Sequence, residues 1–138
     1  MTPELPEDFD PLTLTDSIGL LRFLKVRFLG AIDETHVAAE MPVTDEMTNP
    51  LGIPHGGSIA TLVDFTAGMA CALFFPYPCS TSDLQLRYLA PARGTLIRAE
   101  ATILRSGKRL VVVEVRVLDE DGTLLGSASL AMAPIIPA

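Results

Sequence analysis

The residue whose position most strongly suggests chemistry is Asp64, a carboxylate inside an apolar stretch. From Gly56 to Phe75 the chain carries no other charge, and Ser58 and two threonines are the only other polar side chains. A carboxylate loses its hydration on burial, so it is almost never fully buried without a partner. Catalysis is a common reason to keep such a group. We therefore expect Asp64 to act as a base or nucleophile; the alternative is a structural, hydrogen-bonded carboxylate.

A second set of candidates comes just before this stretch, where His55 is followed by Gly56 and Gly57. A helix N-terminus presents unpaired N–H groups with partial positive charge, and glycines let a ligand approach the backbone closely. The Gly56 N–H is thus a candidate oxyanion donor, a contribution typically worth about 3 kcal/mol. The alternative is that the two glycines only form the turn into the helix.

The spacing of these residues limits how they can cooperate. Asp64 follows Gly56 by eight positions, which separates the two residues by about 12 Å along a helix. The aspartate leans toward the helix N-terminus and recovers about 3 Å, and the remaining gap of roughly 8–9 Å is too long for one shared reacting carbon. Either they share no substrate or Asp64 comes from a second chain. Two antiparallel helices across a two-fold axis would complete the site at a dimer interface.

The elements that must position these residues follow from the hydrophobic pattern. The apolar stretch predicts a helix that begins at Gly56 or Gly57 and ends before Pro76. Strands are expected at residues 25–31, 36–42, 82–89, 95–105, 109–118 and 123–133. Short connections between neighbouring strands predict an antiparallel meander. One long apolar helix with such a sheet predicts an α+β fold in which the sheet wraps around the helix.

The length of 138 residues suits a single domain, which we place at residues 25–138. Residues 1–24 are predicted to be an N-terminal extension with a short helix near residues 16–23. Residues 1–86 carry twelve acids and three bases, whereas residues 87–138 carry seven bases and five acids, so charges of −9 and +2 give the total of −7. Binding of nucleic acid over a broad face is therefore not expected. A local anionic ligand on the second half, or simply solvated strand charges, remain alternatives.

The apolar stretch approaches the length of a transmembrane helix. Asp64 at its centre, three glycines and the lack of a basic flank argue against a membrane span. The acidic N-terminal region has no secretory signal pattern, so a cytoplasmic location is expected. Two cysteines make no disulfide framework and two histidines make no metal-ligand cluster, so neither a metal nor a cofactor is expected.

A longer ordered pattern carries a family resemblance. It runs through Asn49-x-x-Gly52-x-x-His55-Gly56-Gly57, Asp64, Thr81-Ser-Asp83-Leu84, Tyr88-Leu89-x-Pro91, Arg105-x-Gly107-Lys108 and Asp121-Gly122. The pattern resembles the hotdog-fold acyl-CoA thioesterases of the PaaI-like, phenylacetate-pathway type, over about residues 25–133. The resemblance implies a long central helix wrapped by a curved antiparallel sheet. It also implies homodimers that share one continuous sheet, usually paired into a homotetramer.

The resemblance also assigns roles to single residues. Asp64 would attack the thioester or activate water, while the Gly56 amide polarises the carbonyl. Asn49 and His55 would orient the substrate or assist departure of the thiolate, and the Thr81 hydroxyl would help to place water. From the residues alone, His55 could instead bond a loop carbonyl, Asn49 could start a turn and Thr81 could be an ordinary strand residue.

The resemblance further implies that the CoA part of the substrate lies at the subunit interface, near Gly57, with its phosphates close to Arg105 and Lys108. A thioester has a good leaving group, a thiol with a pKa near 8.5. It needs a base or nucleophile, an oxyanion donor and a dry acyl pocket, which we expect Leu62, Phe65 and Met69 to line.

Hydrolysis of an acyl-CoA by a homo-oligomer is therefore the leading hypothesis. A hotdog-fold dehydratase acting on a hydroxyacyl thioester is one alternative, because such enzymes pair a histidine with a carboxylate. A non-catalytic acyl-CoA-binding module is the other, although a binding module would gain nothing from a buried Asp64.

Overall fold

The computed structural model describes residues 7–8, 10 and 13–136, and it contains one long helix inside a curved sheet. The helices are α1 (Leu14–Ser17), α2 (Gly19–Phe23) and α3 (Gly56–Phe74), with a 3-10 turn, η1, at Asp45–Met47. The strands are β1 (Arg27–Ala31), β2 (His36–Pro42), β3 (Cys79–Tyr88), β4 (Leu96–Ser106), β5 (Val111–Asp119) and β6 (Leu124–Pro134).

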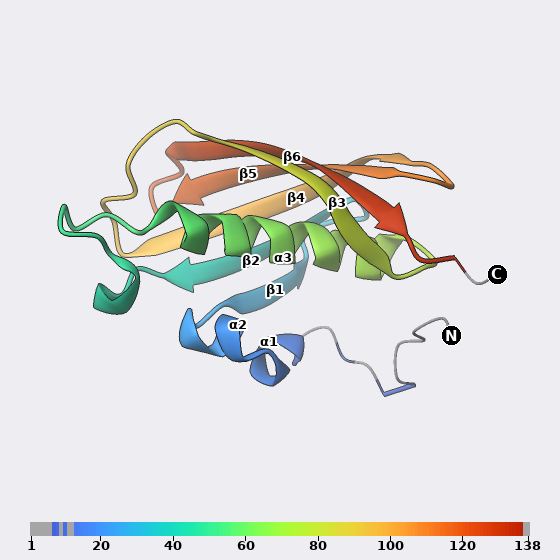
Figure 1. Ribbon diagram of the computed structural model, residues 1–138, viewed down its shortest axis with the longest axis horizontal. Coiled ribbons are helices and arrows are strands. Elements are labelled where there is room, and N and C mark those ends of the chain that lie inside the picture. The colour runs from blue at the N-terminus through green and yellow to red at the C-terminus, as the bar shows by residue number, and fades with distance from the viewer. Residues whose placement is uncertain (1–6, 9, 11–12, 137–138) are drawn as a thin grey trace.

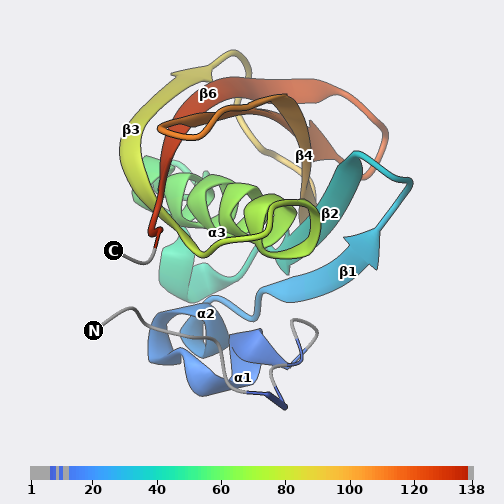
Figure 2. The ribbon, with the colours of Figure 1, turned by 90° about the vertical axis from the view of Figure 1, so that its right-hand side faces the viewer.

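All neighbouring strands are antiparallel, in the order β1-β2-β4-β5-β6-β3. Figure 2 shows the sheet curving around α3 without closing into a barrel, with α1 and α2 lying below β1. The expected α+β hotdog architecture is therefore confirmed. The helical turns predicted near residues 16–23 are present as two short helices, and α2 adds Leu21 and Leu24 to the common core.

Helix α3 begins and ends where its sequence requires. At its start His55 is the N-cap, and its side chain accepts a hydrogen bond from the Gly57 N–H. Pro76 follows shortly after the helix end, which suits a residue that cannot continue a helix. The buried face of α3 is large and apolar, and includes Leu62, Val63 and Met69. Packing against the sheet rather than capping alone therefore holds this helix in place.

One face of α3 is left partly open in the single chain. The open stripe follows the helical repeat and consists of Gly57, Ala60, Thr61, Asp64 and Gly68. A Cβ atom added at Gly68 would meet nothing within 4 Å. Among the described residues α3 alone has the length and apolarity of a membrane span, and half of that stretch is buried inside the protein. The stripe leaves room for another element beside Asp64.

The strands lie close to their predicted positions, with one instructive difference in β3. We predicted its start at residue 82, but pairing with β6 begins at Cys79. Thr81 pairs with Met132, and Asp83 pairs with the adjacent Ala131. Ser82 is therefore an extra residue of β3 that forms a β-bulge. A bulge breaks the alternation of side chains along a strand, and the simple period of two therefore ends there.

Candidate active site

His55 is fixed at the entrance of α3 by hydrogen bonds of its backbone and of its ring. Its backbone N–H donates to the Met47 carbonyl (2.7 Å), and its carbonyl accepts from the Ser58 hydroxyl (2.6 Å). Its Nδ1 accepts the Gly57 N–H at 3.0 Å, and a nitrogen that accepts carries no proton. The neutral ring must then carry its proton on Nε2. His55 is therefore arranged to donate a hydrogen bond from Nε2 to a ligand.

The loop before α3 is shaped by Asn49, as the turn interpretation predicted. Its side-chain oxygen accepts hydrogen bonds from the N–H groups of Leu51 (2.9 Å) and Ile53 (3.2 Å). The loop closes through a further bond from the Gly52 N–H to the Asn49 carbonyl (2.9 Å), and Gly52 has a φ of 73° that favours glycine. Asn49 thus organises the loop.

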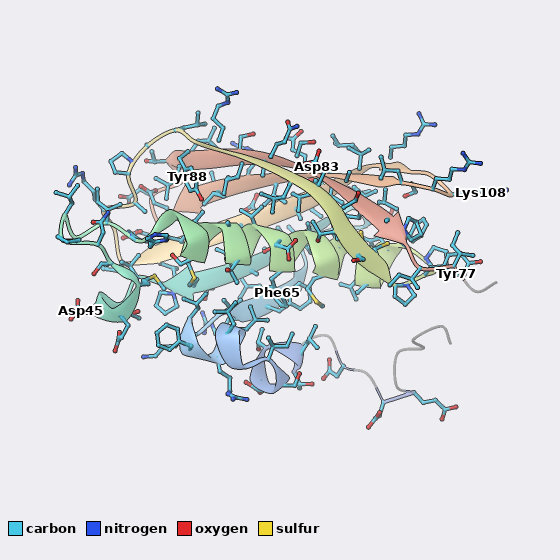
Figure 3. All side chains as sticks on the ribbon, in the orientation of Figure 1. Asp45, Phe65, Tyr77, Asp83, Tyr88 and Lys108 are labelled. Carbon is cyan, nitrogen blue, oxygen red and sulfur yellow. The ribbon has the colours of Figure 1, made fainter. Side chains whose placement is uncertain are left out.

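Tyr88 is a site residue that the sequence analysis quoted only as part of a motif. Its hydroxyl donates a 2.5 Å hydrogen bond to the Gly56 carbonyl, and a Cβ at Gly56 would lie 3.0 Å from that hydroxyl. Burial raises the pKa of the Tyr88 phenol, which therefore stays a donor at neutral pH. In Figure 3 Tyr88 lies at the start of α3. The tyrosine in the Tyr88-Leu89-x-Pro91 motif was the signal that could have identified it.

These contacts fix the Gly56–Gly57 peptide at both ends, by Tyr88 at its carbonyl and by His55 at its N–H. The Gly56 N–H belongs to the preceding peptide and has no hydrogen-bond partner among residues 7–8, 10 and 13–136. It occupies the first turn of α3, where N–H groups carry partial positive charge. The arrangement supplies a rigid backbone donor for a carbonyl oxygen.

Asp64 lies in the middle of α3 and is held by Thr81. The Thr81 hydroxyl donates to Asp64 Oδ1 at 2.6 Å and also contacts the sulfur of Met132 at 3.6 Å. The bulge at Ser82 makes this possible, because it places Thr81 opposite buried Met132 and thus on the face of β3 that looks toward α3. Asp64 is half-buried on the open stripe, and its Oδ2 has no hydrogen-bond partner among the described residues.

The single chain therefore holds two separate half-sites. Asn49, His55 and Gly57 line one cavity at the start of α3, whereas Asp64 and Thr81 lie about two helical turns further on. Thr81, to which the resemblance gives a role in placing water, donates to Asp64, and the chain alone does not bring the carboxylate to the Gly56 N–H.

The two basic candidates, Arg105 and Lys108, lie near the turn between β4 and β5 and are exposed. Figure 3 places Lys108 at the end of the molecule opposite to the start of α3. Within one chain they are therefore not brought to Gly57. They lie instead at the end of the sheet where β3 begins. The strand pairings show this, since Ser106 pairs with Val111, Val111 with Met132, and Met132 with Thr81 near the start of β3.

The residues expected to line an acyl pocket lie elsewhere. Leu62, Phe65 and Met69 belong to the hydrophobic core, with at most 9% of each exposed. They face the sheet because of the 3.6-residue helical repeat, which the uniform hydrophobicity of α3 conceals. A cavity of about 410 Å³ instead opens beside His55 and Gly57, with α2 as its apolar wall.

Comparison with known proteins gives a consistent result. The sequence profile of the Thioesterase superfamily matches residues 51–125. A Halobacterium salinarum protein that carries an esterase name is 38% identical over 110 residues, which are 75% of this chain and 72% of that protein. Acyl-coenzyme A thioesterase 13 of Mus musculus is 38% identical over 93 residues, 66% of each chain. Among solved structures, a thioesterase variant of Pseudomonas aeruginosa has a TM-score of 0.83 and 25% identity, covering 98% of this chain and 99% of that one.

Proposed function

The chain belongs to the thioesterase superfamily, and we propose that this thioester hydrolase cleaves acyl-CoA to a free acid and CoA in a site that two copies of the chain share. The observation that carries the proposal is the pair of unused groups on α3. One is the Gly56 N–H, and the other is Oδ2 of Asp64, eight residues further along the same helix.

An antiparallel pair of α3 helices joins these groups. If Gly56 of one copy lies opposite Asp64 of the other, the two-fold axis passes beside Ala60, midway between them. Ala60 is small and lies on the open stripe together with Gly57 and Gly68, so the two helices can approach closely. Strand β3 is a ten-residue edge strand with mostly exposed side chains, which suits continuation of the sheet into the second copy.

The chemistry then follows from the donors and acceptors. Asp64 attacks the thioester carbon through Oδ2, or it takes a proton from a water that attacks the same carbon. The Gly56 N–H of the second copy, with the Nε2–H of its His55, stabilises the negative charge that develops on the carbonyl oxygen. In the first route the C–S bond breaks, CoA leaves as a thiolate, and water then hydrolyses the acyl–Asp64 anhydride to the free acid and the carboxylate. In the second route the C–O bond forms to the water oxygen, the C–S bond breaks, and the proton taken by Asp64 passes to the departing thiolate or to solvent. Thr81 keeps Asp64 in position throughout through Oδ1.

Release of free thiol from a panel of acyl-CoAs tests this proposal. Asp64→Asn keeps the shape of the side chain and an oxygen that can accept from Thr81, but it removes the base or nucleophile. We expect the turnover to fall by at least about a hundredfold while the fold is retained. Asp83→Asn is the matched control, because Asp83 is exposed on the same strand as Thr81.

Unchanged turnover in Asp64→Asn would remove the mechanism. If the wild-type protein binds acyl-CoA without releasing thiol, the chain is a binding module. If it releases water or adds it to an unsaturated acyl group with the thioester intact, the chain is a dehydratase.

A further inference from the structure

We propose that α2 forms one wall of the acyl-binding site and that the enzyme therefore prefers uncharged, apolar acyl groups. This inference rests on the proposed function, since it locates the acyl part of that substrate. It concerns residues that lie outside the stretch matched by the superfamily profile, which begins at residue 51.

The cavity beside His55 has two chemically different ends. Its volume of about 410 Å³ lies in the range of small-molecule sites, about 300–1,000 Å³. Its lining includes Leu20, Phe23, Glu46, Met47, His55 and Gly57. The polar end contains the imidazole and the glycine turn that would meet a thioester carbonyl. The apolar end consists of α2 and Met47, so an acyl chain bound at the carbonyl end would extend toward α2.

The side chains of α2 and of Leu24, the residue directly after it, divide into two groups. Leu21 and Leu24 are only 4% exposed and anchor the helix in the core. Leu20 and Phe23 are 55% and 59% exposed, and yet both line the cavity. Large apolar side chains that face a cavity next to polar groups are typical of ligand sites. A bound acyl chain would remove this exposed apolar surface from water.

Charge at the cavity narrows the class of acyl group. Glu46 is exposed at the 3-10 turn η1 and lines the same cavity, and none of the described residues that line it is a lysine or an arginine. Arg22 of α2 lines a different cavity and donates to the Asp16 carbonyl. A second carboxylate at the far end of an acyl chain would lose its hydration against Leu20 and Phe23 and would face the Glu46 carboxylate. Monocarboxylic acyl groups are therefore favoured over dicarboxylic ones of the same length.

The test is a chain-length series with variants of the wall. For Phe23→Ala and for Leu20→Ala combined with Phe23→Ala, we expect kcat/KM with octanoyl-CoA to fall about tenfold or more. The loss should lie mainly in KM, because an apolar wall binds the acyl chain equally in the ground and transition states. Activity on acetyl-CoA should stay within about twofold, since a two-carbon acyl group contacts little of the wall. Wild-type enzyme should hydrolyse hexanoyl-CoA faster than adipoyl-CoA.

The controls separate this inference from its premise. Ile32→Ala removes an apolar side chain of similar exposure, 50%, in the turn between β1 and β2, and should leave the whole series unchanged. A loss in the α2 variants that is the same for every chain length, or no loss at all, would overturn the inference while hydrolysis stands. A uniform loss together with a smaller solution mass would show that a second copy of the chain covers α2 instead. A wild-type protein that hydrolyses no acyl-CoA would remove both proposals.

Discussion

Single hydrogen bonds decide which groups at the site stay available. Tyr88 and His55 occupy the carbonyl and the N–H of the Gly56–Gly57 peptide, and Thr81 occupies one oxygen of Asp64. What is left is one N–H, one carboxylate oxygen and the Nε2–H of His55. These are the donor and acceptor types that thioester hydrolysis needs.

The role of the Gly56 N–H can be tested with proline, because Gly56 is the first residue of α3. Proline is well accepted at that position of a helix, and His55 before it already has the extended backbone (φ −59°, ψ 136°) that a following proline requires. Gly56→Pro therefore removes one N–H and adds ring atoms beside the Tyr88 hydroxyl. We expect kcat to fall about 10²–10³-fold, the usual effect of losing one oxyanion donor. Steady-state kinetics and a thermal melt check this.

Gly56→Ala is the matched control for the added side-chain atoms. Alanine places a Cβ in the same position, 3.0 Å from the Tyr88 hydroxyl, but keeps the N–H. The tyrosine tip can move to relieve this contact, so most of the activity should remain. Equal losses in the proline and alanine variants would show that crowding of Tyr88, rather than the missing donor, causes the defect.

Secondary structure elements were largely predictable from the sequence, because their hydrophobic patterns are local. The bounds of α3 followed from the glycines at residues 56 and 57 and from Pro76, and the alternating valines identified β5. The bulge at Ser82 was not predictable, since an extra residue in a strand depends on its partner strand. The open stripe on α3 was not predictable for a similar reason. Small apolar residues such as alanine occur on both its open and its buried face, so the sequence does not show which face the sheet covers.

The site was predictable in its residue types but not in all of its contacts. Asp64, Gly56 and His55 stood out because charge and glycine are unusual in or beside an apolar helix. Tyr88 follows Gly56 by 32 positions, and only the three-dimensional fold brings the two together. Thr81 was suggested by the family resemblance, while its bond to Asp64 depends on the bulge.

The turn between β1 and β2 gives a pH-dependent prediction for one element. The Asp33 carboxylate accepts hydrogen bonds from the N–H groups of Thr35 (2.8 Å) and His36 (2.9 Å). The hydrogen bond from the Thr35 N–H has the largest effect on the pKa of Asp33, and the bond to the His36 side chain has the next largest. The pKa is lowered from 3.8 to about 2. Since the folded state has the lower pKa, this stabilisation is complete above about pH 4 and disappears as the pH falls to about 2.

We therefore expect Asp33→Ala to have a lower Tm than the wild type at pH 5, and the difference to become smaller as the pH falls to about 2. Asp33→Asn keeps an acceptor for both N–H groups but does not titrate. Its Tm should lie between the other two at pH 5. Thermal melts across this pH range check the prediction. A difference between wild type and Asp33→Ala that stays constant down to pH 2 would contradict it.

At the scale of the whole molecule, the separation of the half-sites determines how activity depends on assembly. One chain offers a donor at the start of α3 and a carboxylate in its middle, about 12 Å apart along the helix axis. No side-chain rotation within one chain closes that distance. In the mechanism that we propose, each complete site takes its donor from one copy and its carboxylate from the other.

Such a shared site predicts that two inactive variants restore each other. The Asp64→Asn and Gly56→Pro chains are co-expressed in equal amounts. A site is then intact only if its carboxylate comes from a Gly56→Pro chain and its N–H donor comes from an Asp64→Asn chain. Random pairing makes about a quarter of all sites intact, whether the assembly holds two chains or four. We expect about a quarter of the wild-type turnover from the mixture, and about half from purified mixed dimers carrying two different tags.

Each variant paired with a differently tagged copy of itself should stay inactive. Mixed dimers that form but hydrolyse nothing would mean that both residues act within one chain, and the shared site would have to be abandoned.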